Sequence, residues 1–312
     1  MSTASISRRR SPGDVIFAAA AYGCGVFVLV LLGAIIVSLF VGGLPALSHF
    51  GPAFLWHTTW NPVTQTFGAG VPIFGTLVTS LLALVIAVPL AFGIAFYLTE
   101  IAPEWVRRPV GTAIELLAAI PSIIYGMWGF FVIVPIMSQY VMPTLTDWLG
   151  DVPLIGGLFS GPPFGTGLLT AALILAVMVI PFIAATMRDV FLTVPPVYKE
   201  SAYGVGCTTW EVMRSIVIPY TRVSVVGGIM LGLGRALGET MAVTFVIGNA
   251  NRIATSLFDP GNTIASLVAL EFPESPAGSL KLSSLLALGF ILFVISFIVL
   301  AVSRFLLRAR SA

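Results

Sequence analysis

The feature that most constrains this chain is the repetition of apolar runs long enough to cross a lipid bilayer. A transmembrane helix needs about 20 predominantly apolar residues. The runs that reach this length are 15–41, 71–98, 110–136, 167–187, 223–247 and 282–306. Only 9% of the residues are charged, where a soluble domain carries about 25%, so the chain cannot cover a folded domain with a wetted surface. The sequence therefore predicts an all-α membrane protein with six transmembrane helices and no soluble domain.

The distribution of lysine and arginine predicts the orientation. Short cytoplasmic loops retain positive charge during membrane insertion. In the six-helix arrangement, twelve of the 15 basic residues fall on one side, only Arg252 and Lys281 fall on the other, and Arg235 lies inside the fifth run. Both termini are therefore predicted to be cytoplasmic.

Several function classes are excluded by what the sequence lacks. The net charge of +2 is small and the basic residues form no stripe, which argues against nucleic acid. The two histidines, His49 and His57, share one outward loop that offers too few further ligands for a metal site. Cys24 and Cys207 fall in different compartments, so no disulfide is expected. No Gly-x-x-x-x-Gly-Lys-Ser/Thr motif occurs, so the chain does not hydrolyse ATP by that route.

The predicted cytoplasmic loop 188–222 has a different composition from the spans. Pro195 and Pro196 favour the start of a short helix, because a proline N–H is not needed in the first turn. Gly204 and Gly206 can end it. Thr208 or Thr209 is then a candidate N-cap for a second helix.

The same loop carries the most specific motif in the chain. Its residues Glu200, Ser201, Ala202, Gly206, Ile216, Ile218 and Pro219 resemble the EAA loop of bacterial ABC importer permeases. That pattern is Glu-Ala-Ala, three residues, Gly, nine residues, Ile, one residue and Leu-Pro, and the spacing matches throughout. Serine at the second position and isoleucine before the proline are the departures. The resemblance implies a coupling helix that docks into a separate ATPase subunit; the alternative is an amphipathic loop helix lying on the membrane surface.

Two charged residues, Arg235 and Glu239, fall inside the fifth apolar run. A charge at the centre of a membrane helix costs about 2.5–3.5 kcal/mol on insertion scales, so a functional site is the default hypothesis. Residues four apart share one helix face, and the arginine fork matches phosphate oxygens. The alternative is a self-neutralising pair that fixes helix contacts. Glu115, near the inner end of the third run, is expected to snorkel toward water or to pair with a basic neighbour such as Arg107 or Arg108.

A second resemblance covers most of the chain. The run 234–240 (Gly-Arg-Ala-Leu-Gly-Glu-Thr), together with 60–62 (Trp-Asn-Pro) and 116–126, is similar to the permeases of bacterial phosphate-specific transport systems, the PstC type. The resemblance implies the type I ABC importer permease fold in the bacterial inner membrane and ATP-driven import of inorganic phosphate. It places the substrate arginine and its acidic neighbour at Arg235 and Glu239; Ser122, Tyr125 and Thr240 are second-rank candidates for the path.

The implied partners are a homologous permease of the PstA type, two ATPase subunits of the PstB type, and a phosphate-binding protein of the PstS type. ATP and magnesium are used by the ATPase subunit, and this chain is expected to bind no cofactor. The implied organisation is a cytoplasmic tail 1–14, a first helix 15–41, a periplasmic loop 42–70, a permease domain 71–306 containing the coupling loop 188–222, and a cytoplasmic tail 307–312.

Three rival functions are weighed against this one. An ABC permease for sulfate or molybdate would share the same fold. An ion-coupled carrier would be expected to show inverted repeats and further ionisable residues along its path, which the sequence does not clearly contain. A membrane enzyme acting on phosphorylated lipid would need a His, Asp or Ser constellation, and both histidines lie in one outward loop.

Overall fold

The computed structural model describes residues 12–153 and 155–309. Most of the predicted cytoplasmic tail 1–14, with Arg8, Arg9 and Arg10, and the end of the tail 307–312, with Arg310, lie outside the described residues. Within the described part the chain is helical, and the only strand-like pairing there is one isolated bridge between Asn61 and Thr66.

Six helical segments are long and apolar enough to span a membrane, which confirms the predicted number. The first, second, fourth and sixth spans are built from α1 (Pro12–Phe50), α2 (Gly70–Phe96), α7 (Leu168–Leu192) and α13 (Leu280–Ala309). The third span consists of α4 (Ser122–Trp128), η3 (Gly129–Ile133), α5 (Val134–Ile136), η4 (Met137–Val141) and α6 (Met142–Leu149). The fifth span consists of α9 (Thr209–Val212), η6 (Met213–Val217) and α10 (Ile218–Leu237). The shorter elements are η1 (Gly51–Leu55), η2 (Tyr97–Ile101), α3 (Glu104–Ala118), η5 (Gly156–Phe159), α8 (Pro196–Gly204), α11 (Met241–Val246) and α12 (Ile264–Glu271).

The third and fifth spans differ from the predicted bounds because each apolar run contains a break. The run 110–136 is interrupted after α3, and Pro121 becomes the N-cap of α4, so the spanning segment is Ser122–Leu149. The run 223–247 is interrupted at Gly238, so the spanning segment is Thr209–Leu237 and α11 is a separate short helix. Proline and glycine are the residues that most readily end a helix.

Prolines also explain the π-helical turns. Each of the four π turns in the described residues is followed two residues later by a proline: η2 by Pro103, η3 by Pro135, η4 by Pro143 and η6 by Pro219. A proline cannot donate the usual helical hydrogen bond, and its ring clashes with the carbonyl one turn earlier. A π turn widens the helix just before that position, so the helix continues through the proline at η3, η4 and η6, whereas after η2 it ends at the extended residue Ala102.

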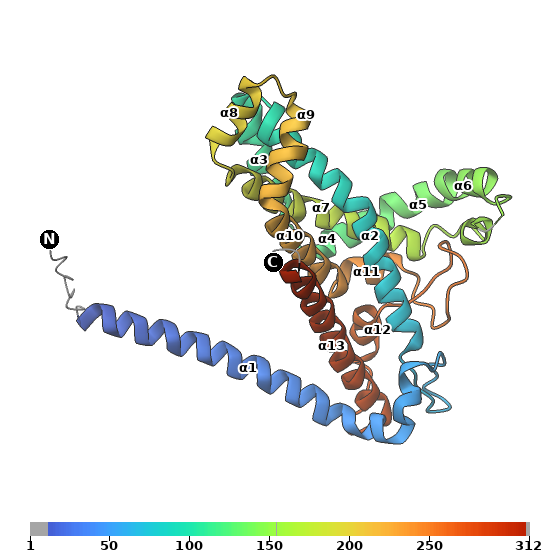
Figure 1. The fold of residues 1–312 in the computed structure, drawn as a ribbon. Helices are drawn as coiled ribbons and strands as arrows, with labels where there is room; N and C mark the ends of the chain where they lie inside the picture. The colour runs from blue at the N-terminus through green and yellow to red at the C-terminus, as the bar shows by residue number, and fades with distance from the viewer. Residues whose placement is uncertain (1–11, 154, 310–312) are drawn as a thin grey trace.

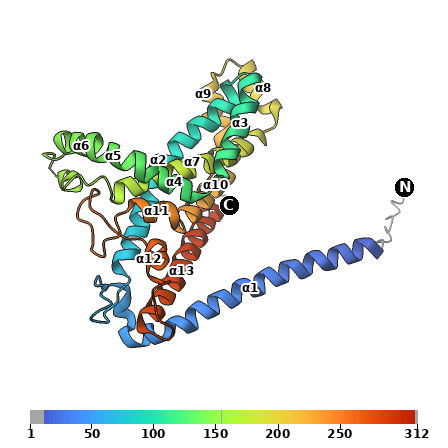
Figure 2. The same ribbon diagram turned by 180° about the vertical axis from the view of Figure 1, so that it is seen from behind.

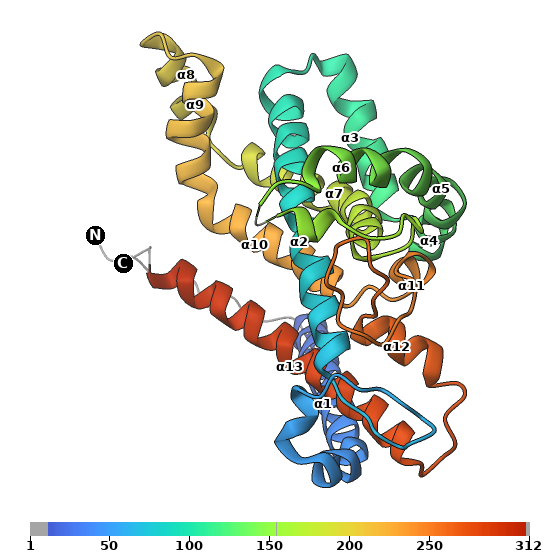
Figure 3. The ribbon, with the colours of Figure 1, turned by 90° about the vertical axis from the view of Figure 1, so that its right-hand side faces the viewer.

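The core forms where α2 lies along α7. A stripe of alanines on α2, four residues apart, is fully buried there: Ala83, Ala87, Ala91 and Ala95. Small residues let membrane helices approach closely. At the other end of the molecule α12 lies beside α13 and α2 (Figure 3).

Helix α1 diverges from the body and contacts it near one end (Figures 1 and 2). There Gly43 meets α13 so closely that a Cβ would lie 2.9 Å from Cα of Ala287. The hydroxyl of Ser283 donates to Gly42 O (2.8 Å) and accepts from the Ala46 N–H (3.0 Å), across the turn that Pro45 occupies. The helix continues to Phe50, well into the predicted loop 42–70.

Candidate functional site

The break that follows α3 and the break that follows α10 lie together at the carbonyl end of α3. The last carbonyls of a helix have no intrahelical partner and carry partial negative charge. The Arg235 guanidinium, from the last turn of α10, donates through Nη2 to Ala118 O at 3.4 Å. The Tyr125 hydroxyl, from α4, donates to Leu117 O at 3.0 Å. The structure thus brings two of the predicted path residues, Arg235 and Tyr125, to one place.

Arg235 and Glu239 do not form the pair that a continuous helix would have made. The helix ends at Leu237, so the expectation that both share one helix face is wrong. The Glu239 carboxylate instead accepts from the Ala242 N–H (3.1 Å) and caps the start of α11. Half-buried Arg235 has no carboxylate within 4 Å among the described residues, and its Cζ lies 5.7 Å from the ring centroid of Phe182. The Ala118 carbonyl and an aromatic face therefore stabilise its charge without neutralising it.

The other two second-rank residues, Ser122 and Thr240, lie at the starts of the short helices α4 and α11. These helices pack closely, because Gly126 of α4 has no side chain: a Cβ there would lie 3.0 Å from Cα of Ala242. The Thr240 carbonyl accepts from the Thr244 hydroxyl at 2.7 Å. Both residues are half-buried and mark the two helix starts beside the break that carries Arg235.

The predicted short helix in the loop 188–222 is present as α8, at one end of the molecule (Figure 1). Glu200 and Ser201 are exposed on it and Ala202 is buried. Gly206 adopts a φ of +93°, a left-handed conformation that glycine accepts without strain. Thr208, and not Thr209, is the N-cap of α9, in a capping box with Glu211.

The motif residues Ile216 and Pro219 lie inside a helix. The fifth span begins well inside the predicted loop 188–222, because α9, η6 and α10 form one helical segment of 29 residues, Thr209–Leu237. The π turn at η6 accommodates Pro219. The α8–α9 segment is therefore joined through α9 to the helix that ends beside Arg235.

The α8–α9 segment is anchored to the end of α2 by contacts that sequence patterns did not reveal. Lys199 Nζ lies 2.5 Å from Glu100 Oε1, and the two side chains are only 16% and 6% exposed. The Trp210 ring packs edge-on against Phe92 and Phe96 of α2, with centroids 6.5 and 5.9 Å away. Lys199 directly precedes the motif glutamate, but its partner lies 99 residues earlier, beyond any local pattern.

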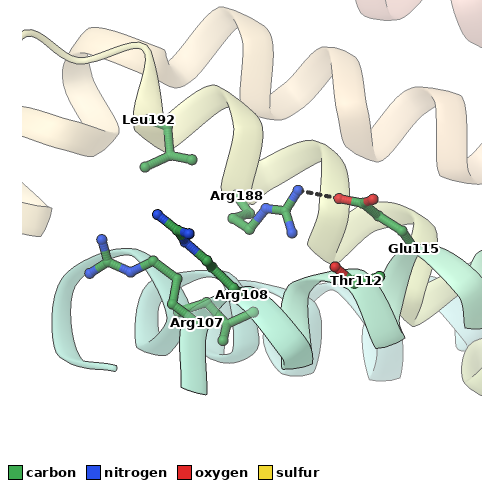
Figure 4. A pocket seen from close by; sticks show the side chains of 7 residues that line it. Arg107, Arg108, Thr112, Glu115, Arg188 and Leu192 are labelled. Carbon is green, nitrogen blue, oxygen red and sulfur yellow. Dashed lines mark hydrogen bonds and ion pairs between the residues drawn. The ribbon is translucent and has the colours of Figure 1, made fainter. Parts of the chain in front are cut away.

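A cavity of about 350 Å³ lies between α3 and α7 and is shown in Figure 4. Glu115 lines this cavity. Its partner is Arg188 of α7, 2.5 Å away, so the expected pairing with Arg107 or Arg108 is wrong. Arg188 also contacts Asp189 at 2.9 Å. Gly111 of α3 permits this arrangement, because a Cβ at that position would collide with the Arg188 guanidinium.

The fold and the site together define a multi-pass membrane permease: six spanning helices, an exposed helix between the fourth and fifth, and an arginine at a helix break. Residues 87–311 match the family model described as "Binding-protein-dependent transport system inner membrane component". The chain belongs to this family.

Relatives resemble the chain along almost its full length. It is 62% identical over 282 residues to the phosphate transport system permease protein PstC of Pasteurella multocida, covering 90% of this chain and 88% of that one. It is 58% identical over 300 residues to the PstC protein of Mesorhizobium japonicum, covering 96% and 91%.

Solved structures share the fold. A chain of the bacterial alginate ABC transporter aligns with a TM-score of 0.60 at 16% identity, covering 93% of both chains. A chain of the MetNI methionine ABC transporter aligns with a TM-score of 0.57 at 14% identity, covering 76% of this chain and 94% of that one. These likenesses confirm the predicted permease fold of ABC importers.

Proposed function

We propose that this chain is the channel-forming permease subunit of an ATP-driven importer of inorganic phosphate. One observation carries the proposal: relatives named as phosphate transport system permeases are 62% and 58% identical over about nine-tenths of both chains. An ABC permease for sulfate or molybdate would have the same fold. Phosphate is favoured because relatives named for phosphate transport match 90% and 96% of this chain.

The proposed assembly contains a second, homologous permease of the PstA type, two ATPase subunits of the PstB type and a periplasmic phosphate-binding protein of the PstS type. The family description, an inner-membrane component of a binding-protein-dependent system, supports this assembly in the bacterial inner membrane. The ATPase subunits dock at α8, whose Glu200 and Ser201 are exposed, and they alone use ATP and magnesium. The side that carries α8 and both termini is the cytoplasmic side, as the excess of basic residues there supports.

Arg235 is the proposed contact for phosphate in the membrane. Its bond to Ala118 O is long, at 3.4 Å, and it has no carboxylate partner in the described part of the chain, so an anion can displace the carbonyl without first breaking an ion pair. The planar fork can then bind two phosphate oxygens. In this proposal Glu239 lies on the path and holds the break open by capping α11.

The proposed mechanism is alternating access, in which ATPase closure moves α8. Because α9, η6 and α10 are one helical segment, the movement reaches Arg235 as a rigid-body displacement. No chemical bond of phosphate is made or broken by this chain.

The test uses the full complex in proteoliposomes with labelled phosphate outside and ATP on the side of the ATPase subunits. Uptake should require ATP and the binding protein, and excess sulfate or molybdate should compete weakly. Arg235→Lys keeps the charge but loses the fork, and Arg235→Ala loses both, so uptake should fall in that order while assembly with the ATPase persists. Normal uptake in both variants, or uptake without ATP, would refute the proposal; stronger competition by sulfate would reassign the cargo.

A further inference from the structure

We propose that the cavity between α3 and α7 binds the phosphodiester headgroup of an anionic phospholipid from the cytoplasmic leaflet. Its walls combine three arginines, Arg107, Arg108 and Arg188, with the apolar side chains of Leu98 and Leu192 (Figure 4). Basic pockets between membrane helices on the cytoplasmic side suit such headgroups. The assignment to that leaflet rests on the orientation in the proposed function.

The arginines around the cavity differ in how far neighbouring carboxylates neutralise them. Arg188 is matched by Glu115 and Asp189, at 2.5 and 2.9 Å. Arg108 lies 3.6 Å from Glu104, but both side chains are at least 80% exposed, and such pairs contribute little.

Arg107 has no carboxylate partner among the described residues. Its Nη2 donates to the carbonyls of Thr99 (3.0 Å) and Ala102 (3.4 Å). These two bonds hold the guanidinium in place without neutralising it. Arg107 and Arg108 therefore offer positive charge to a cavity of about 350 Å³, to which Thr112 contributes a hydroxyl donor.

The surroundings fit a lipid better than a free anion. Helix α3 is amphipathic, with Trp105 80% exposed and Leu116 66% exposed. Tryptophan favours the interface between membrane and water, and an amphipathic helix there keeps its apolar face in contact with acyl chains. Leu192, at the end of the spanning helix α7, places the cavity where headgroups lie. A headgroup can thus bind the arginines while its acyl chains remain in the bilayer.

The test is native mass spectrometry of the purified complex titrated with phosphatidylglycerol or phosphatidylcholine. Each arginine near an anionic headgroup contributes about fivefold in affinity, so Arg108→Gln should weaken phosphatidylglycerol binding about fivefold and Arg107→Gln/Arg108→Gln about 30-fold. Arg214→Gln, an exposed arginine outside the cavity, is the matched control and should change binding less than twofold. The Arg108 side chain is 84% exposed, so Arg108→Gln should leave folding unchanged and tests the cavity even if the double variant fails to fold.

Equal binding of the two lipids, or equal loss in the Arg214 control, would overturn the proposal. Competition with inorganic phosphate separates the two sources of the anion: the lipid should stay bound at millimolar phosphate, and its displacement would assign the cavity to free phosphate instead. Native mass spectrometry measures lipid binding and not transport. The lipid result would therefore hold even if phosphate were not the transported anion.

Discussion

Replacing Lys199 by methionine should uncouple ATP hydrolysis from transport. In the wild type Lys199 Nζ lies 2.5 Å from Glu100 Oε1, and the two side chains are 16% and 6% exposed. Removing one partner of a buried pair costs about 3–5 kcal/mol, because the other charge is left uncompensated. Since Lys199 keeps some solvent contact, we take the lower end, about 3 kcal/mol, which changes the equilibrium for docking of α8 on α2 by roughly 100-fold.

The assay compares phosphate transported per ATP hydrolysed in proteoliposomes. Lys199→Met should lower this ratio at least tenfold while ATP hydrolysis continues, and Glu100→Gln/Lys199→Met should restore part of it because no charge is then left buried. Lys281→Met is the matched control: Lys281 is the other lysine in the sequence, lies 2.8 Å from Glu271, and both are similarly buried, but it is remote from the α8–α9 segment. Equal ratios in the two single variants would refute the role of the Lys199 pair as an anchor.

Three further predictions concern local geometry. Thr208→Ala removes the capping box of α9 and should destabilise the protein by about 1 kcal/mol, measured as a lower midpoint in thermal unfolding. Glu239→Gln should leave folding unchanged because an amide oxygen still accepts from the Ala242 N–H, whereas Glu239→Ala should lower the unfolding midpoint; equal midpoints would remove the capping role. Gly126→Val should separate α4 from α11 and lower both stability and uptake, since even a Cβ would crowd Ala242; unchanged uptake would show that this contact is dispensable.

The number of spans could be predicted because the length of an apolar run directly reflects bilayer thickness. The short helix α8 and the Thr208 cap of α9 could be predicted because proline, glycine and threonine act locally. The break at Gly238 was missed because hydropathy stays high across it, although glycine was the available signal. Pro121 favours a kink by its chemistry, but the high hydropathy around it concealed that the third span begins only there.

The ion pairs could not be predicted in the same way. Glu115 and Arg188 are 73 residues apart, so their contact depends on how α3 packs on α7. The sequence-based choice of Arg107 or Arg108 relied on proximity along the chain, which is a poor guide between helices. The roles of Arg235, Glu239 and the motif residues 200–219 remain predictions, because the structure gives the positions of these residues and not their effect on transport.

The break at Gly238 resolves a conflict that any anion path through a membrane must meet. A lone arginine in hydrocarbon is costly, yet a carboxylate that neutralises it also competes with the anion. On a continuous helix Glu239 would share a face with Arg235 and pair with it. Ending the helix at Leu237 turns Glu239 toward the start of α11, while the carbonyl end of α3 and the ring of Phe182 stabilise the cation. The break at Gly238, which the hydropathy of the sequence does not reveal, therefore leaves Arg235 free to bind phosphate in the proposed function.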